Sequence, residues 1–476
     1  MKNIIRLKGI EVNERKVTYT YEVCGDIKKY FAFLEQYTAE YDIFIGNIPE
    51  SVLTVSFVGM MFGVALLFDA TIEVETLDRD FYESIPVLVE GYRDMYSNRE
   101  LGCKIKAATI CENKLREDTL RALLFYGGGI DSAYSLICNM KANEIVLFQM
   151  WGADIPYDNR IAWENAKTVT EAVADAFEID RHYGRSPFHK IFQEGLLDAY
   201  VEEKFHENFW HGFQHSIGML SQGAPIAYIM NCKVCLFAAT FSKDMDAKAY
   251  TCASDPRIDN YVRFFGLSVQ HDGFDASRQK KVHTIGRYIQ INKKFPIRVC
   301  YLSTDGKNCC ECEKCTRSAA AFWAEKVDPR LVGINYSIEK LAEKLNQAAS
   351  EAASSPAELL YRDIQSTFRN NYEKGEVPEG LFGFYTLEFE EYMKIAGAGD
   401  VWRKRYKKLK SWTDQLQAAK DWLERQNMEQ KAWIDELQCS KDWLESRCNE
   451  LQHWTEELEQ GKKWLEEQYR QYIEHK

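Results

Sequence analysis

With 476 residues the chain is long enough for two or three domains, and its 46% apolar and 28% charged content is ordinary for a folded soluble protein. The formal net charge of −12 argues against a general affinity for DNA, RNA or an anionic membrane surface. The N-terminal stretch lacks an apolar core of signal-peptide length, so we expect a cytoplasmic protein.

Residues 1–118 are expected to form an α+β domain. Residues 16–23 alternate in the manner of a half-buried strand, and residues 70–78 predict a second strand. Residues 79–96 have helical periodicity with acidic residues near their start, which predicts a helix. None of these segments carries a catalytic signature.

The uncharged segment 51–68 raises the question of a membrane span. Its length lies at the lower limit for crossing a bilayer. Glu50 and Asp69 flank it, however, and the Lys and Arg residues that favour a membrane anchor are missing close to both ends. We therefore expect a buried helix that runs into a strand, and no membrane span.

Residues 119–345 alternate between strand and helix patterns. Residues 122–126, 144–151 and 224–230 predict buried strands, and residues 161–177 predict an amphipathic helix. Strands that alternate with helices of this length predict an α/β fold with a doubly wound, Rossmann-like parallel sheet. Such sheets bind ligands beyond the carboxyl ends of their strands.

A glycine-rich loop lies between the first of these strands and a predicted helix at 132–140. Glycine lets backbone N–H groups approach a phosphate closely, and a helix N-terminus adds partial positive charge. A Ser hydroxyl can donate a hydrogen bond there, and an Asp can cap the helix or hold Mg²⁺. The spacing matches neither the Walker pattern nor the dinucleotide fingerprint, and a plain glycine turn is the structural alternative. The predicted phosphate-binding residues are Gly127, Gly128, Gly129, Ile130, Asp131 and Ser132.

Cysteines cluster further along the same predicted domain. Cys300, Cys309, Cys312 and Cys315 have the spacing Cys-x8-Cys-x2-Cys-x2-Cys, which suits a closed tetrahedral Zn²⁺ site. Cys310 could replace Cys309 in an alternative register. Because thiolates are soft ligands, an iron–sulfur or redox role is the alternative to zinc.

The glycine loop resembles the Ser-Gly-Gly-Xaa-Asp-Ser loop of the PP-loop ATP pyrophosphatases, with Gly127 where that family has its first Ser. The loop and the cysteine cluster, in this order, are similar to the 7-cyano-7-deazaguanine synthase family over about residues 120–325. The long segments on both sides indicate a divergent branch. The resemblance implies that the loop binds ATP with Mg²⁺, that Asp131 and Ser132 act in catalysis, and that the four cysteines hold a structural Zn²⁺.

The resemblance also implies a reaction of the ligase type. A carboxylate or carbonyl oxygen of a small molecule would attack the α-phosphate of ATP, and pyrophosphate would leave. A nitrogen nucleophile would then displace AMP to give an amide or a nitrile. Two alternatives stay open. Cys232 and Cys235 form a Cys-x-x-Cys pair that could carry sulfur in a thiolation reaction. Gly127 in place of Ser is also compatible with a catalytically inactive nucleotide-binding scaffold.

Other polar residues are weaker candidates. His211 and His215 are four residues apart in a helical stretch, and such a pair can bind a metal ion. Lys or Arg beyond the strand ends could neutralise charge on a phosphate, and Asp could bind Mg²⁺. A packing or surface role is the alternative for each. The residues that could line the mouth of the sheet are Asp255, Asp259, His271, Arg278 and Lys281.

Residues 346–399 are predicted to form a helical linker region and residues 400–476 a coiled coil. Tryptophan recurs there at spacings of 10 and 11, at Trp412, Trp422, Trp433, Trp443, Trp454 and Trp464. Seven leucines share one heptad position: Leu416, Leu423, Leu437, Leu444, Leu451, Leu458 and Leu465. A heptad repeat of this kind predicts a left-handed coiled coil, and hence a homo-oligomer such as a dimer or trimer. The tryptophans could alternatively dock a partner protein.

Overall fold

The computed structural model separates the chain into two units, Met1–Gly397 and Ala398–Lys476. The described residues are 2–32, 35–116, 119–245, 251–292, 295–300, 302–352, 357–392 and 400–474.

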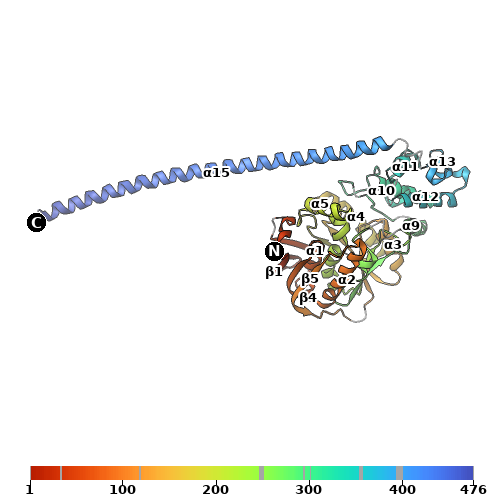
Figure 1. The fold of residues 1–476 in the computed structure, drawn as a ribbon, viewed down its shortest axis with the longest axis horizontal. Helices are drawn as coiled ribbons and strands as arrows, with labels where there is room; N and C mark the ends of the chain where they lie inside the picture. Colours follow the sequence, from red (N-terminus) through yellow and green to blue (C-terminus); the bar gives the residue numbers. More distant parts are fainter. Residues whose placement is uncertain are drawn as a thin grey trace. The chain divides into compact units, whose positions relative to one another are not determined.

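One sheet of 11 strands runs through the first unit (Figure 1). The strands lie in the order β10-β11-β9-β6-β7-β8-β3-β2-β1-β4-β5, and most neighbouring pairs are parallel. Their bounds are β1 Ile4–Asn13, β2 Lys16–Cys24, β3 Gln36–Tyr41, β4 Ala70–Asp78, β5 Cys103–Cys111, β6 Arg121–Phe125, β7 Glu144–Trp151, β8 Asp180–Arg185, β9 Val234–Ala238, β10 Arg263–Phe264 and β11 Leu267–Asp272.

Strand β6 is the point at which the winding of the sheet reverses. The chain passes from β6 to β7 and β8 on one side, and then returns to place β9 and β11 on the other side of β6. These five strands are parallel. In a sheet of this kind, ligands bind beyond the carboxyl ends of the strands at such a reversal. The structure confirms the α/β, Rossmann-like part of the predicted fold.

The strands from residues 1–118 belong to the same sheet. Strands β1, β2 and β3 form an antiparallel meander, and β3 pairs with β8 through Glu40–Arg185 and Tyr41–Gly184. Strands β4 and β5 extend the sheet in parallel beyond β1. The predicted boundary at residue 118 therefore falls between two strands of one continuous sheet, β5 and β6.

Helices cover the sheet and extend the fold beyond it. Their bounds are α1 Glu50–Leu67, α2 Arg79–Tyr96, α3 Ile130–Asn139, α4 Arg160–Phe177, α5 Glu194–Phe205, α6 His215–Gln222, α7 Ala224–Ile229, α8 Pro256–Asp259, α9 Arg278–Asn292, α10 Glu313–Ala324, α11 Ile338–Ala352, α12 Ala357–Asn371 and α13 Phe382–Thr386.

Helix α1 is apolar enough and long enough to be a candidate membrane span, but almost all of it is buried inside the first unit. It packs against β4, α6 and α7. Polar groups tie it to its surroundings: Ser56 Oγ donates to the Ser221 carbonyl at 2.9 Å, and Gln214 Nε2 donates to the Met60 carbonyl at 2.9 Å. The predicted buried helix that runs into a strand is confirmed, since β4 begins three residues after α1 ends.

The predicted strands at 16–23, 70–78, 122–126 and 144–151 are present, and so are the helices predicted at 79–96, 132–140 and 161–177. The strand predicted at 224–230 is wrong, because these residues form helix α7. Pro225 lies in the first turn of α7, where a helix does not need the missing N–H. The strand beside β6 is formed instead by β9.

The segment predicted as a helical linker contributes to a packed core. Helices α10, α11, α12 and α13 lie together beyond α9 (Figure 1). Tyr361, Phe368 and Phe384 are almost completely buried in one apolar cluster with side chains of α9 and α10. Residues 393–399 lie outside the described residues.

The described residues of the second unit form helix α15, Asp400–Glu474, of 75 residues. The heptad leucines Leu437, Leu444, Leu451, Leu458 and Leu465 are exposed along it, as are Trp443, Trp454 and Trp464. The side chains of Trp412, Trp422, Trp433, Leu416 and Leu423 lie outside the described part. A coiled coil needs a second helix, so the coiled coil stays a prediction.

We predict that Gly59→Ala destabilises the first unit. A Cβ on Gly59 would lie 2.3 Å from Ser221 Cβ and 2.9 Å from the Ile217 carbonyl oxygen, so α1 and α6 would be forced apart. Overpacking of this kind costs about 1–3 kcal/mol, more than the roughly 1 kcal/mol gained in helix propensity. The measurement is the free energy of unfolding in urea.

The matched control is Gly195→Ala in α5, where a Cβ meets nothing within 4 Å. This variant should be unchanged or slightly more stable, because only helix propensity changes. Equal effects of the two substitutions would contradict the close packing of α1 on α6.

Candidate phosphate site and metal centre

The glycine loop connects the carboxyl end of β6 to the start of α3. Gly128 has a φ of +78°, which L side chains rarely adopt, and a Cβ there would lie 3.2 Å from Val169 Cγ1. Its carbonyl accepts a hydrogen bond from the Arg298 N–H at 2.8 Å. Gly127 is different, because a Cβ on it meets nothing within 4 Å. Gly129 also has room, with the Arg298 carbonyl oxygen 3.9 Å from its Cβ position. Only Gly128 requires glycine for its backbone conformation.

Asp131 is in the first turn of α3, where it pairs with two cations from α9. Arg278 Nη1 lies 2.9 Å from one carboxylate oxygen, and Lys281 Nζ lies 3.0 Å from the other. Burial would raise the pKa of Asp131, but these two cations hold it below its usual value. Lys281 is almost fully buried and also donates to the Ala239 carbonyl at 2.5 Å. Asp131 therefore acts as the counterion that keeps Arg278 and Lys281 beside the loop.

Ser132 has its hydroxyl directed at the loop, since Oγ donates to the Gly129 carbonyl at 3.2 Å. It lines the same cavity as Gly127, Gly129 and Asp131. The residues predicted from the glycine motif thus lie together at one end of β6.

Three further basic side chains face the start of α3. Arg298, Lys314 and Arg317 line a small cavity of about 50 Å³ together with Asp131 and Arg278. Burial lowers the pKa of both Arg298 and Lys314. Lys314 and Arg317 belong to the first turns of α10, so two helix N-termini, of α3 and α10, contribute to this region. A concentration of cations and helix N-termini of this kind suits a phosphate or another anion.

A larger cavity of about 220 Å³ opens beside the loop. The carboxyl-terminal halves of β6, β7 and β9 contribute Phe125, Phe148 and Phe237 to its wall. Polar groups in the wall are Gln149, Asp154, Thr240, His215, Arg298 and Lys314. A cleft lined by both apolar and polar groups at the reversal point of a parallel sheet suits a small-molecule ligand.

The four predicted cysteine ligands come together at one point. Their sulfur atoms all lie within 4.8 Å of one another, and the pairs Cys300–Cys312 and Cys309–Cys315 are both 3.9 Å apart. A tetrahedral Zn²⁺ with Zn–S bonds of about 2.3 Å places its sulfurs about 3.8 Å apart. The donor set therefore fits a metal ion such as zinc. Cys310 is not in the group, since its thiol points to the Asn308 carbonyl at 3.6 Å, and this excludes the alternative register.

The cysteine centre is joined to the basic cavity through the chain itself. Cys312 caps the N-terminus of α10, and Lys314 lies between Cys312 and Cys315. Arg298 is two residues before Cys300, and its Nη1 donates to the Cys300 carbonyl at 3.0 Å. A metal ion on these sulfurs would therefore hold both the start of α10 and the segment that carries Arg298.

The remaining candidates divide into two groups. Arg278 and Lys281 lie at the loop, as predicted. Asp255 is a helix cap, because it accepts from the Arg257 N–H at 2.8 Å at the start of α8. Asp259 is completely buried and accepts from Ser254 Oγ at 2.8 Å and from His271 Nδ1 at 2.7 Å, so these residues form a structural network.

The Cys-x-x-Cys pair does not have the properties of a sulfur carrier. Cys232 and Cys235 are completely buried. Burial raises the pKa of Cys232 to about 12 and that of Cys235 well above its usual value. Neither residue lines the cavity beside the loop. A thiol with these properties is a poor nucleophile.

Sequence reasoning missed several residues at the site. Arg298 lies just before Cys300, and Lys314 lies between Cys312 and Cys315. Basic residues next to the cysteine motif were therefore the signal in the sequence that could have identified them. His211 and His215 are the predicted pair, and His215 lines the larger cavity whereas His211 does not.

A scan against protein-family models finds no match, and a search of the curated proteins finds none either. The loop, the basic cavity and the cysteine centre are therefore the features of the molecule that bear on its function.

We predict that the purified protein contains about one Zn²⁺ per chain and that Cys309→Ser loses it, because three thiolates leave the tetrahedral site incomplete. Metal content is measured by elemental mass spectrometry. Cys310→Ser is the matched control and should keep its metal, since Cys310 lies outside the sulfur cluster. Loss of zinc in Cys310→Ser with retention in Cys309→Ser would contradict the assignment.

Proposed function

We propose that the protein is an ATP-dependent enzyme of the PP-loop type that activates an oxygen of a small molecule by adenylation. The observation that carries this proposal is the glycine loop at the reversal point of the sheet, which faces Arg278, Lys281, Arg298 and Lys314. These four cations outnumber the two carboxylates that lie near them, Asp131 and Asp154. A net positive charge of this kind, next to a helix N-terminus, suits a polyphosphate.

Each part of the site would then have a role in the reaction. The backbone of the loop and the start of α3 would hold the β- and γ-phosphates, which leave as pyrophosphate. Arg298 and Lys314 line both cavities, so they would neutralise charge that develops between the α-phosphate and the leaving group. Asp131 would position Arg278 and Lys281. It is already paired with these cations, so Asp154, which is exposed in the cavity wall, is the better carboxylate for Mg²⁺.

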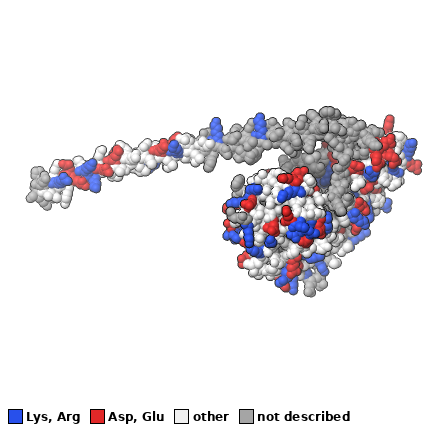
Figure 2. Space-filling model, in the orientation of Figure 1, with Lys and Arg blue, Asp and Glu red and all other residues white. Residues whose placement is uncertain are grey.

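The second substrate would be a small molecule with a carboxylate or carbonyl oxygen, bound in the larger cavity. A nitrogen nucleophile would then attack the activated substrate and displace AMP. On the face seen in Figure 2, basic and acidic side chains of the folded unit are interspersed. This distribution, with the net charge of −12, favours a small molecule over a nucleic acid. Thiolation through Cys232 and Cys235 is disfavoured by the burial of both thiols.

The test is calorimetry with ATP and Mg²⁺, followed by detection of AMP and pyrophosphate. We expect wild type to bind ATP and Gly128→Ser to lose binding by more than about tenfold, because the positive φ cannot be kept without strain. Gly127→Ser is the matched control. Its side chain has open space and adds a hydroxyl donor, so ATP should bind at least as tightly as in wild type.

The outcomes separate an enzyme from a scaffold. ATP binding without any pyrophosphate, in wild type and in Gly127→Ser, would favour the catalytically inactive scaffold. No ATP binding by wild type would contradict the proposal as a whole.

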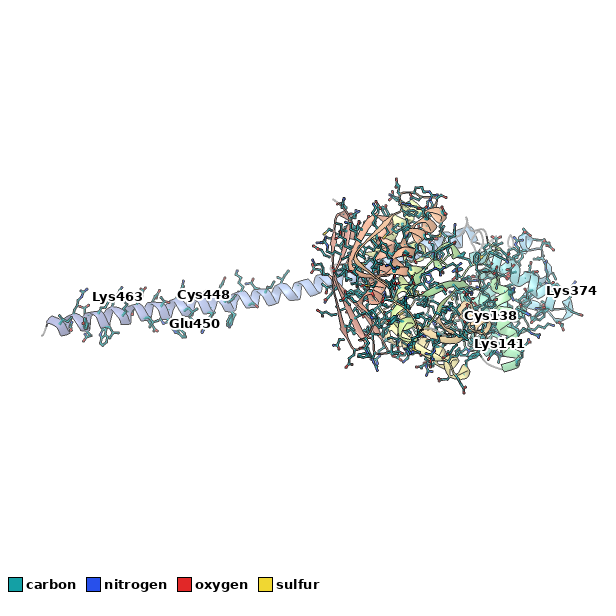
Figure 3. The ribbon with its side chains drawn as sticks, turned by 90° about the horizontal axis from the view of Figure 1, so that it is seen from below. Cys138, Lys141, Lys374, Cys448, Glu450 and Lys463 are labelled. Atoms are coloured by element: carbon teal, nitrogen blue, oxygen red, sulfur yellow. The ribbon has the colours of Figure 1, made fainter. Side chains whose placement is uncertain are left out.

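We also propose that α15 forms a homo-oligomeric coiled coil. Its exposed leucines recur every seven residues, and an isolated helix that exposes such a stripe to water lacks the burial that stabilises helices. Figure 3 shows the side chains of Cys448, Glu450 and Lys463 projecting from α15. The charged residues Glu450 and Lys463 would remain on the solvent-facing side of the coiled coil. A partner protein on the exposed tryptophans remains the second candidate, favoured by Trp443, Trp454 and Trp464.

We predict that the double variant Leu444→Lys/Leu451→Lys dissociates the full-length protein into monomers, because two like charges would enter the apolar seam of every helix. Oligomeric state is measured by light scattering coupled to size-exclusion chromatography. Ser446→Lys/His453→Lys adds the same charge two residues later, away from the leucine position, and should leave the oligomer intact. A wild-type monomer would favour the partner-protein alternative.

A further inference from the structure

The turn that follows strand β7 forms part of the wall of the larger cavity, to which it contributes Ala153, Asp154 and Ile155. The turn is closed by the Gly152 N–H, which donates to the Ile155 carbonyl at 3.1 Å. Gly152 has a φ of +101°, and a Cβ on it would lie 1.9 Å from the Ser186 carbonyl oxygen. The turn therefore packs tightly against the segment that follows β8, and its shape depends on that segment.

His189, in the segment that follows β8, holds the turn in place. Its Nε2 lies 3.0 Å from the Ala153 carbonyl oxygen. A carbonyl oxygen can only accept a hydrogen bond, so Nε2 carries the proton and donates. Of the described residues that line the larger cavity, Ala153 is one and His189 is not. The imidazole therefore acts on the cavity through the backbone of the turn.

Two neighbours fix the orientation of the imidazole ring. Nδ1 of His189 makes a short hydrogen bond to Oε1 of Glu194, in the first turn of α5. Because both ring nitrogens donate, the ring is an imidazolium, and the Glu194 carboxylate is its counterion. The Trp210 ring packs on the imidazole, with the two ring centroids 4.5 Å apart. These contacts keep Nε2 directed at the Ala153 carbonyl.

The segment that carries His189 is attached to the N-terminal part of the chain. The Ala32 N–H donates to the Ile191 carbonyl, and the Gln193 N–H donates to the Tyr30 carbonyl, both at 2.8 Å. Backbone hydrogen bonds thus hold this segment directly after His189. The imidazole is a fixed point from which the turn after β7 is held.

The hydrogen bond to Ala153 determines the direction of one peptide plane. The Ala153 carbonyl and the Asp154 N–H belong to the same planar peptide group, so a contact that orients one orients the other. This peptide leads directly to the Cα of Asp154, whose side chain is exposed in the cavity wall. Burial lowers the pKa of Arg298 and Lys314, and the nearby charge of Asp154 opposes this effect. The Asp154 carboxylate therefore lies near the cations beside the glycine loop.

We propose that His189 is a positioning residue for the Asp154 carboxylate. The inference rests on the proposed function, in which Asp154 binds the Mg²⁺ that accompanies ATP. In nucleotide sites Mg²⁺ is usually held by one or two carboxylates together with the phosphates of the substrate, so the place of a single carboxylate matters. Through its Nε2–H and the Ala153 carbonyl, His189 keeps this carboxylate at the side of the cavity where the phosphates bind.

Two substitutions separate the contact with Ala153 from the rest of the His189 side chain. The amide nitrogen of Gln takes about the place of Nε2, so His189→Gln can still donate to the Ala153 carbonyl. The amide nitrogen of Asn takes about the place of Nδ1, so His189→Asn keeps a donor for Glu194 and loses the bond to Ala153. Both variants lose the imidazolium charge, so only the position of the donor differs between them.

His182→Asn is the matched control. Nδ1 of His182 also lies near a carboxylate, 3.1 Å from Asp42 Oδ1. His182 belongs to β8, however, where it pairs with Phe148 of β7 and not with the turn. Its substitution removes a comparable contact elsewhere in the same sheet.

The measurement is Mn²⁺ binding to the full-length protein with α,β-methylene ATP, followed by the electron paramagnetic resonance signal of free Mn²⁺. His189→Asn and Asp154→Asn should each weaken Mn²⁺ binding about tenfold, whereas His189→Gln and His182→Asn should stay within about twofold of wild type. The double variant His189→Asn/Asp154→Asn should bind Mn²⁺ no more weakly than Asp154→Asn, because both substitutions act on one carboxylate. Calorimetry without a metal ion should give the same affinity for the nucleotide analogue in every variant.

Equal losses in His189→Asn and His189→Gln would overturn the proposal, because a merely structural role does not depend on which nitrogen is kept. Additive losses in the double variant would also overturn it. If wild type binds the analogue and Mn²⁺ while His189→Asn is unchanged, the positioning role alone fails. If wild type binds no analogue in calorimetry, the adenylation proposal fails with it. Urea unfolding shows whether each variant is folded, and His189→Ser, which is also too short to reach Ala153, replaces an unfolded His189→Asn.

Discussion

The pairing of Asp131 with Arg278 and Lys281 is the interaction on which the site depends. Bringing an ammonium group as buried as Lys281 out of water costs several kcal/mol unless a counterion meets it. Arg278 and Lys281 are three residues apart on α9, so both can reach one carboxylate at the start of α3. The sequence neighbours of that carboxylate are the loop glycines. One ion triad therefore sets the distance between the loop and α9.

The first 111 residues have a structural role in the same site. Helix α1 is buried against α6 at Gly59, and α6 begins with His215, which forms part of the cavity wall. The sheet also continues from β8 through β3, so the aromatic core around α1 is continuous with the strands that carry the loop. A segment without any catalytic signature can thus determine the shape of the binding cavity.

Local patterns predicted much of this fold, and tertiary contacts account for the rest. The glycine loop, the strand before it and the cysteine ligands can be recognised from residues that are close together in the sequence. The structure has the loop after a strand and brings the four cysteines together, as predicted. The helix at 224–230 was missed because a short apolar run has no decisive period, and neighbouring helices rather than the sheet cover it. Arg298 could be suspected only from its place two residues before Cys300, because its contact with the Gly128 carbonyl joins distant parts of the chain. The sequence could not decide between Cys309 and Cys310 as the metal ligand, because only the direction of the two thiols in the structure distinguishes them.

The cysteine centre and the basic cavity are formed by the same two segments, and this has a thermodynamic consequence. A metal ion on the four sulfurs and an anion at Arg298 and Lys314 would both stabilise the same placement of the 295–300 segment and the start of α10. Two ligands that favour one conformation are linked, and the linkage is reciprocal. If bound metal raises the affinity for the anion by some factor, bound anion raises the affinity for the metal by the same factor. Occupancy of the anion site and retention of the metal would then rise and fall together.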